Sequence, residues 1–494
     1  MKYILRIIST IFLFAFIASC SEKQRETIDY GESISDIPDL NGKKISTLAG
    51  SVQELMIDTY CPDAEVLRLN SSAEVIAAVV SGQADYFLID TTSLIGAGIE
   101  EKGLKVIFKT GLISSEIGFG FNYKDQALCD EFNAFLARYK DDGRWSQTYK
   151  RWMQGDPNTV ELEHPELNPN GPTLRIGTNN YFPYSFTKNG RYTGFEMEMI
   201  EAFAYETGRN VEYLTIDFSG VIAALAAGKI DMISSSMTIT EERAKKVLFT
   251  DPYFYGSTVG VCRSGDAPVN QKSFFTKVKE SFYNNLIVED RWKIVVDGLW
   301  ETIIISLCSI LLGTLFGGFI CWMRLSRRKL LGSIAKVYIE IIRGVPILVL
   351  LMLMFYVIFA QTAVSPRWVA IIAFAMNFGA YVSEMFRTGI LSVDKGQTEA
   401  GLAMGFTPFK TFVNFVVPQA AKHALPVFKG EAVSLFKNTS VVGFIAIQDL
   451  TKASEIIRAR TFDAFFPLII VSIIYFLLAW LLGKVLDGLA KKIK

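Results

Sequence analysis

The hydrophobic pattern divides the 494-residue chain into two parts. Before about residue 294, short β-rich runs such as Leu174–Gly177 and Ile230–Ser234 alternate with helical patterns such as Glu196–Thr207. Long uncharged runs occur only after that point, and five of them approach the roughly 20 residues that a bilayer requires. These candidate spans are 294–323, 337–361, 366–388, 429–448 and 464–486. The pattern predicts an α/β part followed by an all-α membrane part of about five helices.

The first twenty residues predict export. Two basic residues precede an apolar run over 7–17, and small residues lead to Cys20, which is the layout of a secretory signal. The four residues that end at Cys20 resemble a lipobox, in which Cys20 would be lipidated. An ordinary signal or a short membrane anchor is the alternative. In each case the segment that follows is expected outside the membrane.

Charge predicts the same orientation. Basic residues follow the first span at 324–329 and close the chain at 491–494, so both flanks are expected in the cytoplasm. An odd number of spans then starts outside, which predicts a multi-pass membrane protein with its α/β part on the outer face. The 50 Lys and Arg residues balance 50 Asp and Glu residues, which argues against a nucleic-acid partner. The cysteine spacings predict no metal site.

The polar stretch between the third and fourth spans carries a recognisable motif. Glu399-Ala400-Gly401, then Gly405 and Pro418, resembles the EAA loop of ABC importer permeases, although that family usually has Ala where this chain has Gly401. The resemblance implies docking onto a separate ABC ATPase subunit and a homodimer formed through the permease domain. An amphipathic cytoplasmic loop without this role is the alternative.

Two flanking motifs narrow the family. The E-x-x-R-G-x-P pattern at 340–346 and the K-x-T-S pattern at 437–440 resemble segments of polar amino-acid permeases. The chain contains no G-x(4)-G-K-[S/T] motif, so we expect no ATP hydrolysis, no cofactor and no enzymatic activity in this chain itself. ATP would be used by the partner subunit.

The run from 173 to 254 resembles the first lobe of type II periplasmic binding proteins for polar amino acids. Such a ligand needs a cationic fork for its carboxylate and an apolar surface for its side chain. The resemblance implies a ligand site in which Arg243 binds the α-carboxylate, Ser236 and Thr238 add hydroxyls, Ser235 adds a backbone carbonyl, and Tyr181 and Phe218 enclose the side chain. A surface charge for Arg243, and core packing for Tyr181 and Phe218, are the alternatives.

The family's second lobe precedes the first in this chain, which predicts a circular permutation. The turn before Ser51, Val52 and Gln53 resembles the loop whose amides complete carboxylate binding. Asp90 matches the carboxylate for the ligand ammonium, and a cap on a helix that begins at Thr91 is the alternative reading. The stretch 156–172, rich in Pro, Asn and Glu, would join the natural ends.

These inferences combine into one architecture. We expect a signal over 1–20, the second lobe with its returning helices over 21–155, a linker over 156–172, the first lobe over 173–265, a connector over 266–293 and a permease over 294–494. The chain would import a polar amino acid; a ligand-gated channel and a membrane-tethered sensor are the rival readings. The uncharged Asn179 and Asn180, near positions that select side chains in relatives, favour a ligand such as glutamine.

Overall fold

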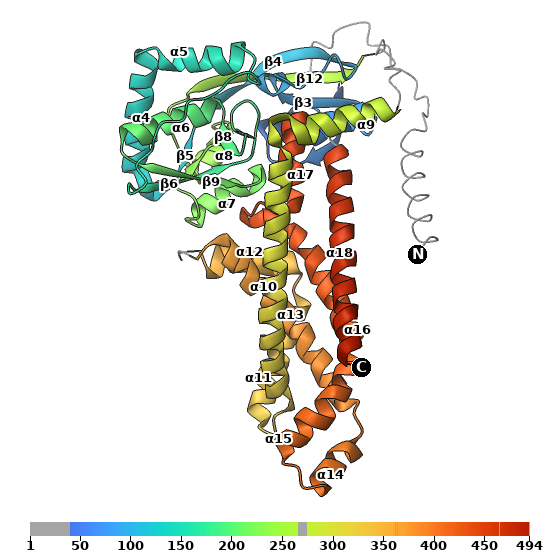
Figure 1. The fold of residues 1–494 in the computed structure, drawn as a ribbon. Coiled ribbons are helices and arrows are strands. Elements are labelled where there is room, and N and C mark those ends of the chain that lie inside the picture. The colour runs from blue at the N-terminus through green and yellow to red at the C-terminus, as the bar shows by residue number, and fades with distance from the viewer. Residues whose placement is uncertain (1–39, 265–273, 361, 363, 464, 494) are drawn as a thin grey trace.

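A two-lobed α/β domain lies at one end of a bundle of long helices (Figure 1). The computed structural model describes residues 40–264, 274–360, 362, 364–463 and 465–493. The expected signal and its Cys20 lie outside the described residues. The observed class is the expected one, with mixed sheets first and helices afterwards.

The first lobe in chain order is built on a five-stranded sheet in the order β2-β1-β3-β12-β4. β1 pairs in parallel with β2 and β3, and β12 runs antiparallel to β3 and β4. Its elements are β1 (Lys44–Leu48), α2 (Val52–Tyr60), β2 (Glu65–Leu69), α3 (Ser72–Val80), β3 (Tyr86–Asp90), β4 (Leu104–Ile117) and β12 (Phe254–Arg263). We call this unit lobe A.

Lobe B is built on a second five-stranded sheet in the order β11-β5-β10-β6-β9. Its strands are β5 (Gly120–Phe121), β6 (Thr173–Thr178), β9 (Asn210–Thr215), β10 (Met232–Ile233) and β11 (Leu248–Phe249), with a hairpin of β7 (Phe186–Lys188) and β8 (Arg191–Thr193). Its helices are α4 (Gln126–Asp141), α5 (Arg144–Tyr149), α6 (Phe195–Glu206), α7 (Val221–Ala226) and α8 (Glu241–Ala244). β6, the fourth strand in the sheet order, pairs in parallel with β9 and β10.

The chain crosses between the lobes twice, from β4 to β5 and from β11 to β12. Each sheet therefore contains strands from both the early and the late part of the domain's sequence: β12 joins β1–β4 in lobe A, and β5 joins the later strands in lobe B. The expected lobe over 173–265 differs from this topology at its end, because β12 pairs with β3 and β4 and so belongs to lobe A. The two short crossings are the hinge elements of the fold.

The helices that return after lobe A pack on lobe B through aromatic side chains. Phe132 and Phe135 of α4 contact Phe203 of α6, with ring centroids 4.6 and 5.5 Å apart. All three rings are fully buried. Edge-on contacts between aromatic rings add to the burial of their apolar area, so α4 is a fixed part of lobe B.

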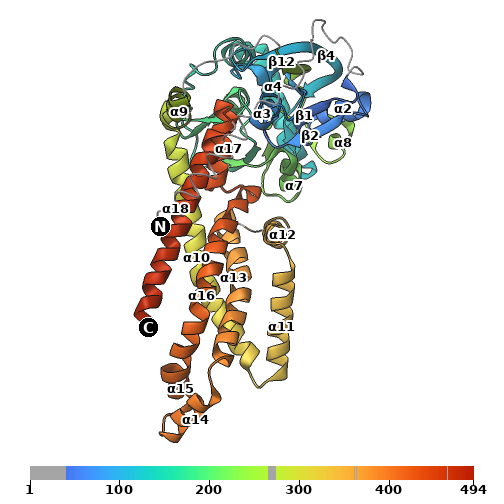
Figure 2. The ribbon, with the colours of Figure 1, turned by 90° about the vertical axis from the view of Figure 1, so that its right-hand side faces the viewer.

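The helical part extends away from the lobes (Figures 1 and 2). Among the described residues, α10, α13 and Phe466–Gly488 of α18 are long and apolar enough to cross a membrane, and a bent pair counts as a fourth span if it is taken as one. The helices are α9 (Phe274–Phe282), α10 (Trp292–Leu325), α11 (Lys329–Gly344), α12 (Ile347–Leu353), α13 (Pro366–Leu391), α14 (Lys395–Ala403), α15 (Pro408–Thr411), α16 (Val417–Asn438), α17 (Leu450–Thr461) and α18 (Phe466–Ile493).

The expected span over 337–361 is a broken helix. α11 and the segment Ile347–Ile358 meet at an angle of 107°. Pro346 separates them, and Val345 before it is extended, with φ −99° and ψ 129°. Proline lacks the N–H that would continue the helix and disfavours a helical conformation in the preceding residue. The bend therefore follows from the Gly-Val-Pro sequence.

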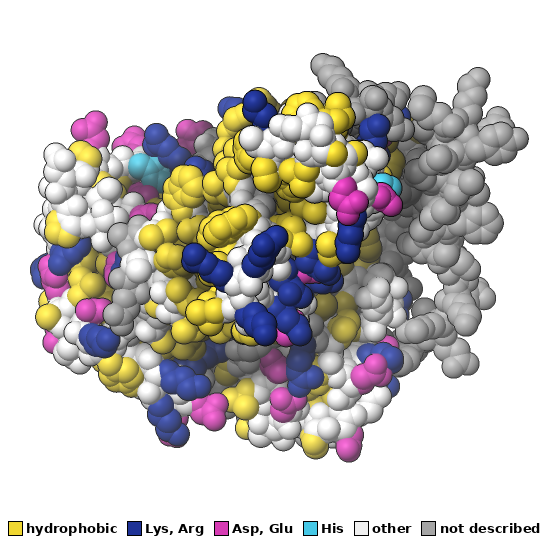
Figure 3. All heavy atoms as spheres, turned by 90° about the horizontal axis from the view of Figure 1, so that it is seen from below, with side chains coloured by type: hydrophobic (Ala, Val, Ile, Leu, Met, Phe, Trp, Pro, Cys, Tyr) yellow, Lys and Arg dark blue, Asp and Glu magenta, His cyan; other side chains and the backbone are white. Residues whose placement is uncertain are grey.

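The expected fourth span, 429–448, is not one continuous helix. α16 covers Val417–Asn438, and a 3-10 segment, Thr439–Ile445, follows it. α16 lies beside α13 and α18 as part of the bundle but is too polar to qualify as a span by composition. Polar residues lie in both halves of α16, among them Gln419 and Glu431, so its apolar signal is weak along its whole length. The end of the bundle away from the lobes carries a concentration of Lys and Arg side chains (Figure 3).

Candidate functional site

Arg243 connects the two lobes. It lies in the short helix α8, whose N-cap Thr240 accepts a hydrogen bond from the Arg243 amide at 3.2 Å. Its guanidinium donates to the carbonyl of Thr238 in lobe B and to the carbonyl of Gly50 in lobe A, each at 2.7 Å. The same guanidinium lies 5.4 Å from the ring centre of Phe218. The structure thus brings together three predicted site residues, Arg243, Thr238 and Phe218. It also places Gly50, which was not predicted, in contact with Arg243.

The Arg243 guanidinium has no ion-pair partner among the residues that the structure describes. Desolvation by burial lowers its pKa to about 10, which still leaves it charged at neutral pH. A desolvated cation is stabilised by a carboxylate that binds both arms of its fork. Its two bonds to neutral carbonyls leave that need unmet, so the position suits an incoming anion.

Asp90 and Tyr181 form the second contact between the lobes. The Tyr181 hydroxyl donates a hydrogen bond to the Asp90 carboxylate. Asp90 also accepts from the Ser93 hydroxyl at 2.5 Å and from the Ser93 amide at 3.1 Å, as the N-cap of a 3-10 turn over Thr91–Leu94. Asp90 therefore caps the 3-10 turn and contacts lobe B at the same time. Burial, followed by the Asp90 charge, raises the pKa of Tyr181 well above its ordinary value.

Ser51 begins α2 in lobe A next to Gly50. Its hydroxyl caps the helix by accepting from the Glu54 amide at 3.2 Å. Val52 and Gln53 form the first turn and are buried, and the Gln53 amide donates to Thr258 at 3.2 Å. The loop predicted to complete carboxylate binding thus lies at the N-terminus of α2, beside the carbonyl that accepts from Arg243.

Glu196, which the sequence analysis missed, supports the serine loop of lobe B. Its buried carboxylate accepts from the Ser236 amide at 2.8 Å and from the hydroxyls of Ser234 and Tyr253. Burial raises the pKa of Glu196. Ser235 contributes a buried hydroxyl without a hydrogen-bond partner among the described residues, as does the side-chain oxygen of Asn179. Both atoms have unused hydrogen-bonding capacity.

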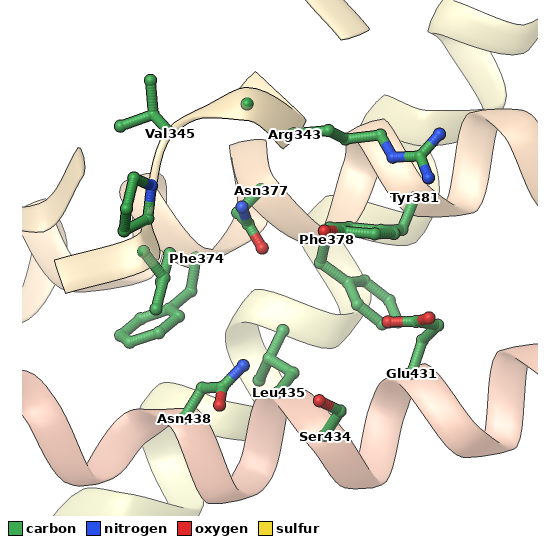
Figure 4. Close-up of a pocket in the computed structure, with 13 residues that line it drawn as sticks. Arg343, Val345, Phe374, Asn377, Phe378, Tyr381, Glu431, Ser434, Leu435 and Asn438 are labelled. Carbon is green, nitrogen blue, oxygen red and sulfur yellow. The ribbon is translucent and has the colours of Figure 1, made fainter. Parts of the chain in front are cut away.

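A second cavity, also missed from the sequence, lies within the helical part. It has a volume of about 520 Å³ and opens between the α11–α12 break, α13 and α16. Figure 4 shows Arg343 above the ring of Tyr381, 4.9 Å from its centre, and Glu431 on α16 below it. The lining combines these charges with amides and apolar rings: Arg343, Gly344, Val345, Pro346, Ile347, Phe374, Asn377, Phe378, Tyr381, Glu431, Ser434, Leu435 and Asn438.

Comparison with known proteins identifies both parts of the chain. Residues 174–411 match the model for bacterial extracellular solute-binding proteins, family 3. The L-cystine transport system permease protein TcyB of Bacillus subtilis is 34% identical over 203 residues, which are 41% of this chain and 87% of that protein. The chain belongs to the polar amino-acid ABC transporter permeases.

The chain is also similar to two further proteins. A putative glutamine transport system permease protein GlnP of Rickettsia typhi is 30% identical over 40% of this permease chain and 92% of its own. A crystal structure of an amino acid ABC transporter with histidines is 31% identical, covering 45% of this chain and 99% of that one, with a TM-score of 0.39. These relatives are transporter subunits rather than enzymes.

The loop that resembles the EAA motif lies at the end of the permease farthest from the lobes, in α14 and α15 (Figure 1). Glu399 and Ala400 are exposed on α14, Gly405 follows it with φ 85°, and Pro418 lies in the first turn of α16. The departure at Gly401 has a local reason. A methyl group there would lie 2.6 Å from Cγ2 of the buried Thr411, so Thr411 fills the space that the usual alanine would occupy.

Proposed function

We propose that the two lobes capture a polar amino acid on the outer face of the bacterial inner membrane and that the helical part passes it inward. The observation that carries this proposal is Arg243. Its half-buried guanidinium has no carboxylate partner among the described residues and donates to carbonyls of both lobes. An α-carboxylate between the lobes would replace those weaker bonds and draw the lobes together.

The remaining groups suit the other parts of an amino acid. Asp90 offers a carboxylate to the ammonium, and its bond from Tyr181 occupies that position in the present conformation. The rings of Tyr181 and Phe218 offer apolar faces to the side chain. The unpartnered Asn179 oxygen favours an uncharged polar side chain, such as that of glutamine.

The membrane cavity suits the same cargo. Arg343 and Glu431 present opposite charges to one space, as a zwitterion requires, and ionised groups within a membrane are costly unless they serve a function. The lobes would deliver the amino acid to this cavity, and a conformational change in the helices would release it inward.

A separate ABC ATPase would supply the energy through the exposed Glu399 on α14. Two copies of this chain would pair through their permease domains with two ATPase subunits. Cys20 would carry lipid, and the chain itself would hold no cofactor. The circular order of the lobes, joined through 156–172, would keep the binding domain attached to the transporter that it serves.

The test is calorimetric titration of the full chain in lipid nanodiscs with the twenty common amino acids and L-cystine. We expect saturable binding of one polar amino acid, weakened at least roughly thirtyfold by Arg243→Ala, because truncating one partner of a buried charge pair costs about 2–5 kcal/mol. Lys245→Ala, an exposed cation two residues away, is the matched control and should bind as the wild type does. Absence of binding by the folded wild type would refute the proposal.

A further inference from the structure

Helix α17 lies between the lobes and the membrane helices (Figures 1 and 2). It has twelve residues, Leu450–Thr461, and connects the 3-10 segment after α16 to α18. Three of its buried residues are cations: Lys452, Arg458 and Arg460. Burying a cation costs free energy unless an anion or another polar group pairs with it. The partners of these three cations therefore show which parts of the protein α17 is attached to.

Lys452 holds lobe B. Its ammonium lies 2.5 Å from the Asp217 carboxylate and 2.8 Å from that of Glu455 on α17 itself, and its side chain is only 8% exposed. Asp217 immediately precedes Phe218, the ring that lies against Arg243. A bond to Asp217 therefore acts directly beside the proposed ligand site.

Arg458 holds lobe A. Its guanidinium lies 3.0 Å from the Glu74 carboxylate and its side chain is 7% exposed. Glu74 lies in the first turn of α3, where the Ser71 hydroxyl accepts from its amide at 3.3 Å and the Asn70 amide donates to its carboxylate at 3.1 Å. These bonds fix Glu74 to lobe A, so a displacement of Arg458 would be transmitted to the whole lobe.

Lys452 and Arg458 are six positions apart, about 9 Å along a rigid helix. Both bonds can form together only when Glu74 and Asp217 are held at the matching distance, which requires the lobes to be near each other. A small pocket between the lobes and α17 has a volume of about 50 Å³, which is room for a few water molecules. Its wall includes Asn70 and Glu74 of lobe A, Phe218 of lobe B, and Ile456 of α17.

We propose that α17 is a strut of the permease that holds the two lobes closed, with Lys452 and Arg458 as positioning residues for amino-acid capture. The effect on amino-acid capture rests on the proposed function, whereas the contacts of α17 with the two lobes do not. The strut covers the side of the cleft that faces the membrane, so the captured amino acid leaves towards the bundle only after α17 or a lobe moves. Through the 3-10 segment, α17 continues into α16, which carries Glu431 of the membrane cavity.

Arg460 provides a matched control on the same helix. Its guanidinium pairs with Glu289 before α10 at 2.5 Å and with Asn158 of the linker at 2.8 Å, and it lies over Phe182 of lobe B at 4.7 Å. None of these partners belongs to lobe A. Removing this cation should weaken the attachment of the domain without changing the spacing of the lobes.

The experiment measures the distance between the lobes in the full chain without ligand. Spin labels are attached at Thr59→Cys on lobe A and Glu212→Cys on lobe B, both exposed, in a background with the native cysteines replaced by alanine. Pulsed EPR should give one narrow distance distribution, and Lys452→Met or Arg458→Met should add a population at longer distance. Arg460→Met should leave the distribution narrow.

The pairing is tested by exchanging charges. Combining Arg458→Glu with Glu74→Arg should restore the narrow distribution lost in Arg458→Met. Unchanged distances in both methionine variants, equal broadening in Arg460→Met, or failure of the exchange to restore the distance would each overturn the strut. Binding of L-glutamine by the full chain should fall about tenfold in Lys452→Met if the lobes are predominantly open. Wild-type protein that binds no amino acid would refute the proposed function while the distances still decide the strut.

Discussion

The tightest helix contact in the membrane part depends on glycine, and this allows a sharp prediction. α10 and α13 pack along Gly313 and Gly317, four residues apart, as membrane helices do where small residues let backbones approach. A methyl group at Gly317 would lie 2.7 Å from the carbonyl oxygen of Gly379 and 2.8 Å from Cβ of Val382. Neither atom can rotate away, so Gly317→Ala must separate the helices.

The neighbouring glycine is the control. A methyl group at Gly318 would have its nearest neighbour, the ring of Phe386, at 3.9 Å, which is ordinary contact. Both substitutions gain helix propensity, about 1 kcal/mol each, whereas only Gly317→Ala has the overpacking cost of roughly 1–3 kcal/mol. We therefore expect Gly318→Ala to be neutral or stabilising and Gly317→Ala to be less stable than it by about 1–3 kcal/mol.

The assay is the temperature at which half of the detergent-solubilised full chain ceases to elute as a single species from a sizing column. Gly317→Ala should lower this midpoint by several degrees relative to Gly318→Ala. Gly379→Ala should fall between them, because its methyl group would lie 3.0 Å from the Phe316 ring and 3.2 Å from the Gly313 carbonyl. Equal midpoints for Gly317→Ala and Gly318→Ala would refute the close contact of α10 with α13.

Three further predictions concern the ligand site, the loop and pH. Tyr181→Phe keeps the aromatic face, so amino-acid affinity should stay within about tenfold of wild type by calorimetry, whereas Tyr181→Ala should lose more; equal losses would exclude a role for the ring. Glu399→Arg on the exposed α14 should abolish co-purification of a co-expressed ABC ATPase subunit, while Thr398→Arg on the same helix should retain it; loss in both would point to misfolding of α14. Burial raises the pKa of Glu289, but Arg460 and a second arginine outweigh that effect and hold the pKa below 4.5. The stability that Glu289 contributes is therefore present above pH 4.5 and is lost as the pH falls through its folded pKa. The difference in heat stability between wild type and Glu289→Gln should shrink on acidification, and a difference that grows would contradict the pairing.

The lobe architecture was predictable because its information is local. The strands expected at 174–177 and 230–234 appear as β6 and β10, and the helix expected at 196–207 appears as α6, each within one or two residues. The resemblance to type II binding proteins had already assigned Arg243, Phe218 and Asp90 to one predicted ligand site. What the sequence could not supply was the pairing of β12 with lobe A, since a strand's sheet depends on partners far along the chain.

The membrane part was predictable in composition but not in shape. Hydropathy averages over a window, so it reported one span over 337–361 and could not convey the 107° bend, although Pro346 stood in the sequence as its cause. The same averaging placed the fourth span over 429–448, across the end of α16 and the 3-10 segment that follows it, because a hydropathy window does not register where a helix ends.

Helix α17 shows the limit of sequence reasoning most clearly. Its twelve residues contain too many charges for a span and read as a polar connection between two membrane helices. Its buried cations acquire meaning only from Asp217 and Glu74, which lie 235 and 384 residues earlier in the chain. A cation whose partner is so distant has the same local sequence as a solvated one, so burial and pairing have to be observed before it can be given a role. The contact between lobes and bundle was therefore the part of this transporter that only the structure could supply.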